Sequence, residues 1–130
     1  MTNKSTRETG SWGEQKAVEF LLQNNYTILK TNYRIGRIGE IDIIAREAEY
    51  TCFIEVKTRR SRSFGAPVES VTASKQKKLR QLASIYLSNT AGMDKCVRFD
   101  VVEILAAGTT GPTDGGTDEI ESINLIKNAF

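Results

Sequence analysis

Two short apolar runs, each interrupted by charged residues, constrain the fold of this chain most strongly. They read GEIDIIA at residues 39–45 and TCFIEVK at residues 51–57, and the charged turn REAE separates them. So short a connection makes two strands antiparallel neighbours in one sheet. Alternation along the second strand places Glu55 and Lys57 on one face and their apolar neighbours on the other. The runs therefore predict paired strands that carry charges among apolar side chains.

Asp42, Glu55 and Lys57 are costly to bury unless they bind a metal ion or each other. Carboxylates on adjacent strands are ligands for Mg²⁺, or for Mn²⁺ in its place, and a nearby lysine can orient or deprotonate a water. Phosphodiester hydrolysis needs this combination. The alternative is a cross-strand ion pair on a solvated sheet face, but Phe53 and Ile44 favour a mostly buried face.

Two further acids have two interpretations each. Glu14 follows Ser11 at the spacing of a capping box, and it also leads the apolar stripe of a predicted helix that faces the sheet, from which it can reach the cation. Glu40 shares a face with Asp42 and is either a further ligand or a charge at the start of a strand. The sequence leaves both pairs of alternatives open.

Three other residues are expected to serve the fold rather than a ligand. Asp100 interrupts the apolar run VRFDVVEI, where pairing with Arg98, another arginine or the backbone is favoured over metal binding. Trp12 and Tyr33 can stack on nucleic-acid bases, but a small domain more often uses its aromatic side chains for packing.

The composition excludes several classes of enzyme. The 130 residues include no histidine, which removes His-based general bases, histidine metal sites and Ser-His-Asp triads. Cys52 and Cys96 form no C-x-x-C pair and are expected to be free thiols of a cytoplasmic protein. No apolar run approaches the roughly 18 residues of a membrane span, and the polar start lacks the core of a signal peptide.

Basic residues are concentrated in one segment. Residues 57–80 contain eight Lys and Arg side chains and the single acid Glu69, although the whole chain has a net charge of only +2. Such clustering is typical of contact with a phosphate backbone, and a solvated helix face is the alternative for the later lysines. The residues expected to bind nucleic acid are Arg34, Arg59, Arg60, Arg62, Lys75 and Lys78.

The chain is expected to form one α/β domain over residues 1–130. Residues 1–10 are expected to be flexible, and the Gly/Thr-rich segment 106–118 to be a mobile loop. The element order is α-β-β-β-α-β-β: a helix from residue 11 to about 24, strands at 26–34, 39–45 and 51–57, a helix at 72–88 with Thr72 as its N-cap, and strands at 95–105 and within 119–130.

Several segments in this order resemble the YraN-like family of uncharacterised bacterial proteins: GEIDIIA, FIEVKTR, FGAPVESVTASKQKKL, RFDVVEI and the terminal NAF. That family is similar to the PD-(D/E)xK nucleases and to archaeal Holliday-junction resolvases. The resemblance implies a restriction-endonuclease-like fold, a mixed central sheet flanked by helices. It matches Asp42 and Glu55 to the two acidic positions, Lys57 to the lysine and Glu14 to a helix glutamate that completes the metal site. Ile41 stands where the motif has proline.

The leading hypothesis is an Mg²⁺-dependent nuclease acting on DNA, with branched or junction DNA as a candidate substrate. Resolution of a four-way junction needs two symmetric cuts and would imply a homodimer. One alternative is a non-catalytic nucleic-acid-binding protein with the same fold. Another is an interaction subunit of a DNA repair or uptake assembly that docks through the sheet and the helix at 72–88, since a fold does not determine a function.

Overall fold

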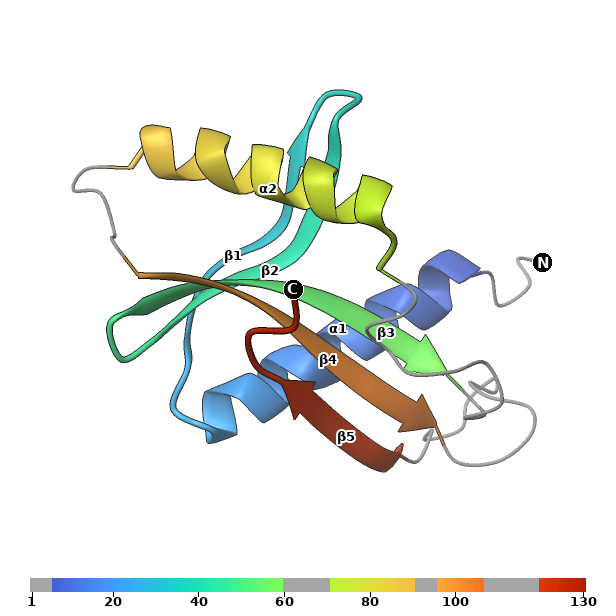
Figure 1. The fold of residues 1–130 in the computed structure, drawn as a ribbon. Coiled ribbons are helices and arrows are strands. Elements are labelled where there is room, and N and C mark those ends of the chain that lie inside the picture. The colour runs from blue at the N-terminus through green and yellow to red at the C-terminus, as the bar shows by residue number, and fades with distance from the viewer. Residues whose placement is uncertain (1–5, 60–70, 91–95, 107–119) are drawn as a thin grey trace.

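The computed structural model describes residues 6–59, 71–90, 96–106 and 120–130. Two helices flank one five-stranded sheet, and the order α-β-β-β-α-β-β is as predicted (Figure 1). The elements are α1 (Thr6–Gln23), β1 (Thr27–Ile35), β2 (Gly39–Glu47), β3 (Tyr50–Arg59), α2 (Ala73–Ser88), β4 (Val97–Ala106) and β5 (Ile120–Ile126). None of the helices in the described ranges is long and apolar enough to span a membrane.

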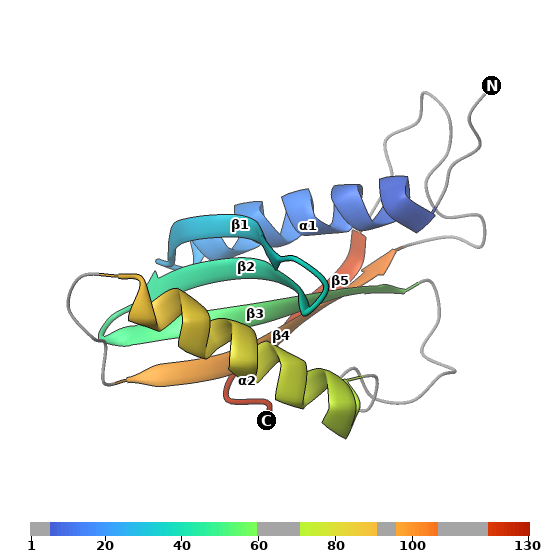
Figure 2. The same cartoon turned by 90° about the horizontal axis from the view of Figure 1, so that it is seen from above.

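The sheet is mixed, and its strands lie in the order β1-β2-β3-β4-β5. The β1–β2, β2–β3 and β4–β5 pairs are antiparallel, whereas β3 and β4 are parallel. The parallel pair requires a crossover, which carries α2 over one face of the sheet. Helix α1 covers the other face, as the view from above shows (Figure 2). This is the architecture that the resemblance implies.

Each helix packs on its own apolar core. Below α1, the core contains Leu21 and the β3 residues Cys52 and Ile54. Below α2, it contains Leu82 and Phe53, which lies between those two β3 residues in the chain. This alternation confirms the strand periodicity predicted for residues 51–57. Both sheet faces are therefore buried along the first half of β3, which explains its near-continuous apolar sequence.

Helix α1 begins at Thr6, five residues before the predicted start at Ser11. The capping-box interpretation is therefore wrong, because Ser11 lies inside the helix. The segment TRETG that precedes Ser11 contains no proline, so nothing in it forces the helix to begin later. Residues 6–10 of the expected flexible segment lie in α1, and Ala106 of the expected mobile loop ends β4. The rest of these two segments, residues 1–5 and 107–118, lies outside the described residues.

Helix α2 and the β1–β2 turn follow the local signals of the sequence. The Thr72 hydroxyl accepts a hydrogen bond from the Lys75 backbone N–H at 3.2 Å, which confirms the predicted N-cap. Gly36 and Gly39 adopt φ values of 44° and 142° in the turn between β1 and β2. The tip of this hairpin lies beside α2 in both ribbon views (Figures 1 and 2).

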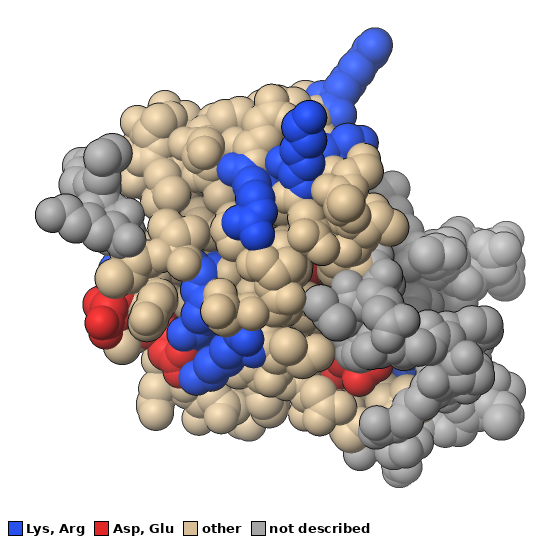
Figure 3. All heavy atoms as spheres, viewed as in Figure 1, with Lys and Arg blue, Asp and Glu red and all other residues tan. Residues whose placement is uncertain are grey.

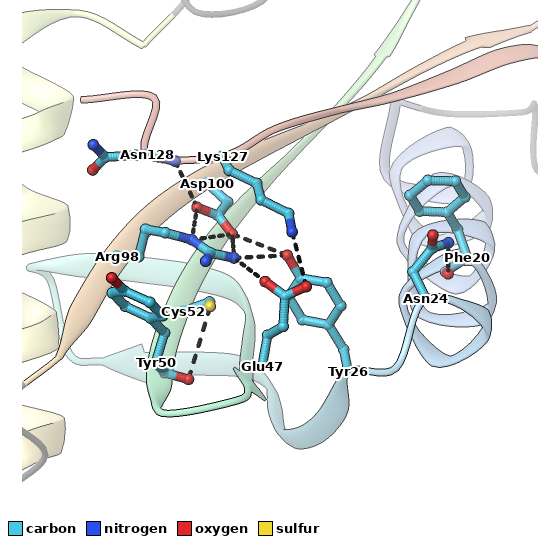
Figure 4. Close-up of polar contacts among 10 residues, drawn as sticks. All are labelled: Phe20, Asn24, Tyr26, Glu47, Tyr50, Cys52, Arg98, Asp100, Lys127 and Asn128. Atoms are coloured by element: carbon cyan, nitrogen blue, oxygen red, sulfur yellow. Dashed lines mark hydrogen bonds and ion pairs between the residues drawn. The ribbon is translucent and has the colours of Figure 1, made fainter.

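The charges on β4 form a buried network, as the sequence predicts for Asp100 (Figure 4). The fully buried Asp100 carboxylate accepts bonds from Arg98 Nε at 2.9 Å and from the Asn128 backbone N–H at 2.9 Å. Arg98 Nη2 also donates to the Tyr26 hydroxyl and to Glu47. These bonds compensate the desolvation of both charges and place Asp100 in the framework of the fold.

Gly13 allows close contact between α1 and β3. A Cβ atom at this position would lie 2.0 Å from Thr58 Oγ1 and 3.3 Å from Thr58 Cβ. No alanine fits here without movement, although alanine is the better helix former by about 1 kcal/mol. The next residue along α1 is Glu14, so this contact also fixes the distance of Glu14 from the sheet.

We expect Gly13→Ala to lower the free energy of unfolding by about 1–3 kcal/mol through overpacking. The matched background is Thr58→Ala, which removes the clashing Oγ1 and should make Gly13→Ala nearly neutral. Thr58→Val keeps a γ-carbon in that place and should not relieve the cost. Urea denaturation of the single and double variants measures these couplings. Equal effects of Gly13→Ala in all three backgrounds would refute the close contact.

Candidate active site

The candidate site lies where β2 separates from β3, and we call this place the fork. The β2–β3 pairing ends at Ile43 and Ile54, although β3 continues to Arg59 beside β4. Ile41 packs in the core below α2, whereas Ile43 packs in the core below α1. Residues two apart in a regular strand point to the same face, so the strand β2 is twisted out of regular alternation at Asp42. Figure 1 shows the β1–β2 hairpin rising away from β3 toward α2.

At the fork, the Asp42 carboxylate takes the place of a backbone partner. Its Oδ2 accepts a hydrogen bond from the Val56 backbone N–H at 2.8 Å. This N–H belongs to the first residues of β3 beyond the β2–β3 ladder. Because a buried N–H without a partner is unfavourable, the bond stabilises the separation of the strands and holds the Asp42 side chain against β3.

Glu55 brings two lysines to the fork from different elements. Its carboxylate is 6% exposed, and Oε2 lies 3.2 Å from Lys57 Nζ on the same strand. The Lys75 ammonium, from the first turn of α2, contacts the same oxygen. The predicted common face of Glu55 and Lys57 is confirmed, and the α2 crossover adds Lys75, whose contact with Glu55 the sequence does not indicate.

Glu14 reaches the fork from the opposite face of the sheet. Its carboxyl is within hydrogen-bonding contact of Asp42. The Asn32 amide, oriented with its nitrogen toward the acids, donates to Glu14 Oε1 and to Glu40 Oε2, each at 2.9 Å. Of the two predicted roles for Glu14, the structure rejects the cap and supports the sheet-facing position. Glu40 also joins this group. The acid cluster, as we name it, comprises Glu14, Glu40, Asp42 and Glu55.

Burial and mutual repulsion perturb the acid cluster. Burial, followed by the charge of Glu55, raises the pKa of Asp42 from 3.8 to about 8, against the opposing effect of the Val56 N–H. Burial and the charge of Glu40 likewise raise the pKa of Glu14, although its bonds to Asp42 and Asn32 oppose the shift. Repulsion among carboxylates of this kind is relieved by a proton or by a cation.

The pKa values of the two lysines are shifted in opposite directions. Burial and the neighbouring Lys75 ammonium lower the pKa of Lys57, and Glu55 only partly opposes this. Burial is the largest single effect on Lys75 and acts to lower its pKa. The hydrogen bond to Glu55, the contact with Lys57 and the charges of Glu55 and Asp42 together outweigh burial, so the pKa of Lys75 is raised. Lys57 is thus the easier ammonium to deprotonate, while Lys75 stays charged. Opposite shifts in neighbouring groups are typical of acid–base assignments at active sites.

The donor chemistry at the fork fits a small divalent cation. Carboxylate oxygens are hard ligands, and Mg²⁺ often takes only one or two of them together with water and substrate phosphate. As the described residues stand, no group of three or more His, Cys, Asp or Glu side chains is placed to hold a metal ion, so at most two carboxylates would bind it directly. Asp42 and Glu55, with Glu14 beside them, are the residues that would hold the ion.

Comparison with known proteins places the chain in a family. The profile of the Uncharacterised protein family UPF0102 matches residues 13–104. The chain belongs to this family. A UPF0102 protein of Acetivibrio thermocellus is 51% identical over 124 residues, with 95% of this chain and 92% of the relative covered. Another, from Caldicellulosiruptor saccharolyticus, is 44% identical over 124 residues, with 95% and 98% covered. These matches confirm the YraN-like resemblance, and the matched range includes the acid cluster and both lysines.

The basic residues predicted to bind nucleic acid occupy different positions in this UPF0102 chain. Lys75 lies at the fork, and Lys78 is exposed one turn later on α2. Arg34 is also exposed and lies 3.6 Å from Glu40. Arg59 is instead mostly buried against Glu103, with Nε 3.2 Å from Oε2. Arg60 and Arg62 lie outside the described residues.

Trp12, Tyr33 and the two cysteines have the structural placements expected for them. Trp12 packs against the core below α1, and the Tyr33 ring meets the Tyr86 ring edge-to-face at 5.3 Å. Cys52 and Cys96 are both free. The aromatic residues singled out in this UPF0102 sequence thus contribute to packing.

Asp42 and Asp100 both interrupt apolar strands, but we expect their replacement by asparagine to have opposite effects on stability. The Asp42 pKa is higher in the folded state, so protonated Asp42 favours folding below pH 3.8, and this contribution is lost as the pH rises to about 8. Asp42→Asn keeps an acceptor for the Val56 N–H and removes the charge. Without metal, it should therefore raise the melting temperature above pH 8 and change it little below pH 4.

The matched variant is Asp100→Asn, which removes the fully buried one of the two carboxylates that pair with Arg98 and should cost about 3–5 kcal/mol. Thermal unfolding in EDTA, followed by circular dichroism across this pH range, measures both variants. If Asp42→Asn destabilises the protein above pH 8 as Asp100→Asn does, the account of the acid cluster is wrong.

Proposed function

We propose that this UPF0102 chain is a metal-dependent nuclease that hydrolyses phosphodiester bonds of DNA. The observation that carries the proposal is the convergence at the fork of Asp42 and Glu55 with Lys57 and Lys75. Two carboxylates supply a cation site, and two ammonium groups with different pKa values lie beside it. Phosphoryl transfer uses positioning and electrostatic stabilisation of this kind.

Asp42 and Glu55, with Glu14, would hold Mg²⁺ or Mn²⁺. The bound ion would offset charge on the phosphate and acidify a coordinated water. Lys57, with its lowered pKa, would orient that water and could accept its proton. Lys75 keeps its charge and can contact a phosphate oxygen, because it reaches the same carboxylate from α2.

The substrate follows from where the cationic side chains lie. Lys and Arg atoms appear over α2 and toward the tip of the β1–β2 hairpin in Figure 3, and a further group of basic atoms lies below α2 beside acidic ones. Acidic atoms are seen only below α2 in that view. Such a surface contacts phosphate backbones and selects nucleic acids by shape rather than by base sequence. We infer a branched DNA substrate in the cytoplasm, and resolution of a four-way junction would require a homodimer with two symmetric sites.

The test is cleavage of labelled junction, flap, single-stranded and duplex DNA by the purified chain with Mg²⁺ or Mn²⁺. We expect cutting that EDTA abolishes. Asp42→Asn and Lys57→Ala should each lower the cleavage rate by about 100-fold or more, since each removes a group that acts on the reacting phosphate or water.

Lys30→Ala is the matched control, because Lys30 is exposed on β1 and pairs with Ile44 of β2, outside the acid cluster. It should cut like the native chain. Salt-sensitive DNA binding with no metal-dependent cutting on any of the four substrates would reject the nuclease and favour a binding protein with this fold.

A further inference from the structure

A cleft separates the first turns of α2 from the tip of the β1–β2 hairpin. Its volume is about 430 Å³, within the range of sites that enclose a small molecule. Arg37 and Gly39 form the hairpin wall, and Ser74 and Lys78 form the helix wall. The remaining described lining residues are Ile38, Glu40, Thr72, Lys75, Leu79 and Leu82. The hairpin and α2 lie side by side in Figures 1 and 2, as this lining requires.

The cleft shares two residues with the fork. Lys75 lines the cleft, and its ammonium contacts Glu55. Glu40 also lines the cleft, and it accepts from the Asn32 amide that bonds to Glu14. A strand whose phosphate lies at the carboxylates of the fork would therefore bring its neighbouring nucleotide to the cleft.

The lining combines cationic side chains with a partly exposed aliphatic one, Ile38. Arg37, Lys75 and Lys78 carry three positive charges, against Glu40 as the acid among the described lining residues. The first turn of α2 contains no acidic residue. Leu79 and Leu82 lie behind the cleft in the core below α2 and are only 4% and 0% exposed, so the accessible aliphatic surface comes from the partly exposed Ile38 of the hairpin. Positive charge beside apolar surface complements a ligand that has an anionic group and a flat, weakly polar ring.

We propose that this cleft binds one unpaired nucleotide next to the phosphate held at the fork. Its phosphate lies against Lys75 and Lys78, and its base packs against the partly exposed Ile38 on the hairpin side of the cleft. A base within a duplex is stacked and paired, so it must leave the helix to enter such a cavity. The proposal rests on the proposed nuclease and deepens it, because it assigns the substrate class as DNA with a single-stranded or splayed nucleotide at the cut.

The test measures binding in EDTA, so that it does not depend on cleavage. The probes are fluorescein-labelled oligothymidine, the same strand made of abasic nucleotides, and a blunt duplex of equal length. By fluorescence anisotropy, we expect oligothymidine to bind about fivefold more tightly than the abasic strand, because only the former has bases to bury. Ser74→Trp, which fills the cleft, should abolish that difference and leave duplex affinity unchanged.

Lys77 provides the matched control for charge. It is exposed and adjacent to Lys78 on α2, but it does not line the cleft. Lys78→Glu should weaken oligothymidine binding about tenfold, and Lys77→Glu should weaken it severalfold less, although both variants lose the same charge. Melting curves should show that all three variants remain folded.

Three results would overturn the cleft: equal binding of oligothymidine and the abasic strand, a fivefold preference that survives Ser74→Trp, or equal losses for the two charge reversals. None of these three binding results bears on whether the chain cuts DNA in the presence of a metal ion. Conversely, base-dependent binding that Ser74→Trp abolishes supports the cleft even if the chain cuts no substrate, so failure of the cleft and failure of the nuclease are distinguishable.

Discussion

The bond from the Val56 N–H to Asp42 Oδ2 is the interaction on which the site depends. In a sheet, the backbone N–H and C=O groups of each strand normally form hydrogen bonds with the neighbouring strand. The pairing of β2 with β3 ends at Ile43 and Ile54, where the two strands separate. A side-chain carboxylate satisfies the exposed backbone instead. The separation of the strands then leaves room for Glu14 from one face of the sheet and Lys75 from the other. Without the fork, residues of α1 and α2 would be separated by a continuous sheet.

The two charged centres of the sheet illustrate different uses of buried charge. At Asp100, cationic and hydrogen-bonding partners compensate the carboxylate, and the network holds β4 to Tyr26, Glu47 and the chain after β5. At Asp42, burial and neighbouring acids raise the pKa to about 8, so the same kind of residue opposes stability in its ionised form. Such centres are typical of sites that a bound ligand compensates, which is why we propose a function for the fork and a structural role for the network on β4.

Local patterns in the sequence predict the elements and much of the site. Alternation places Glu55 and Lys57 on one face, Thr72 caps α2, and Asp100 pairs with Arg98. The fork could not be predicted, because it depends on where the register of β2 with β3 ends, which no residue type marks. The contact of Lys75 with Glu55 depends on the crossover between parallel strands. The cleft was missed for the same reason, although the glycine-flanked Arg37 and the lysines of α2 were its signals.

The central claim is that the carboxylates of the fork form a divalent-cation site. Anomalous diffraction from crystals of the chain grown with Mn²⁺ tests it most directly, because the signal locates the ion without an activity assay. The account predicts an anomalous peak in contact with both Asp42 and Glu55, with the Lys75 ammonium moved away from Glu55. Peaks found only elsewhere on the surface, with Lys75 still bound to Glu55, would contradict it.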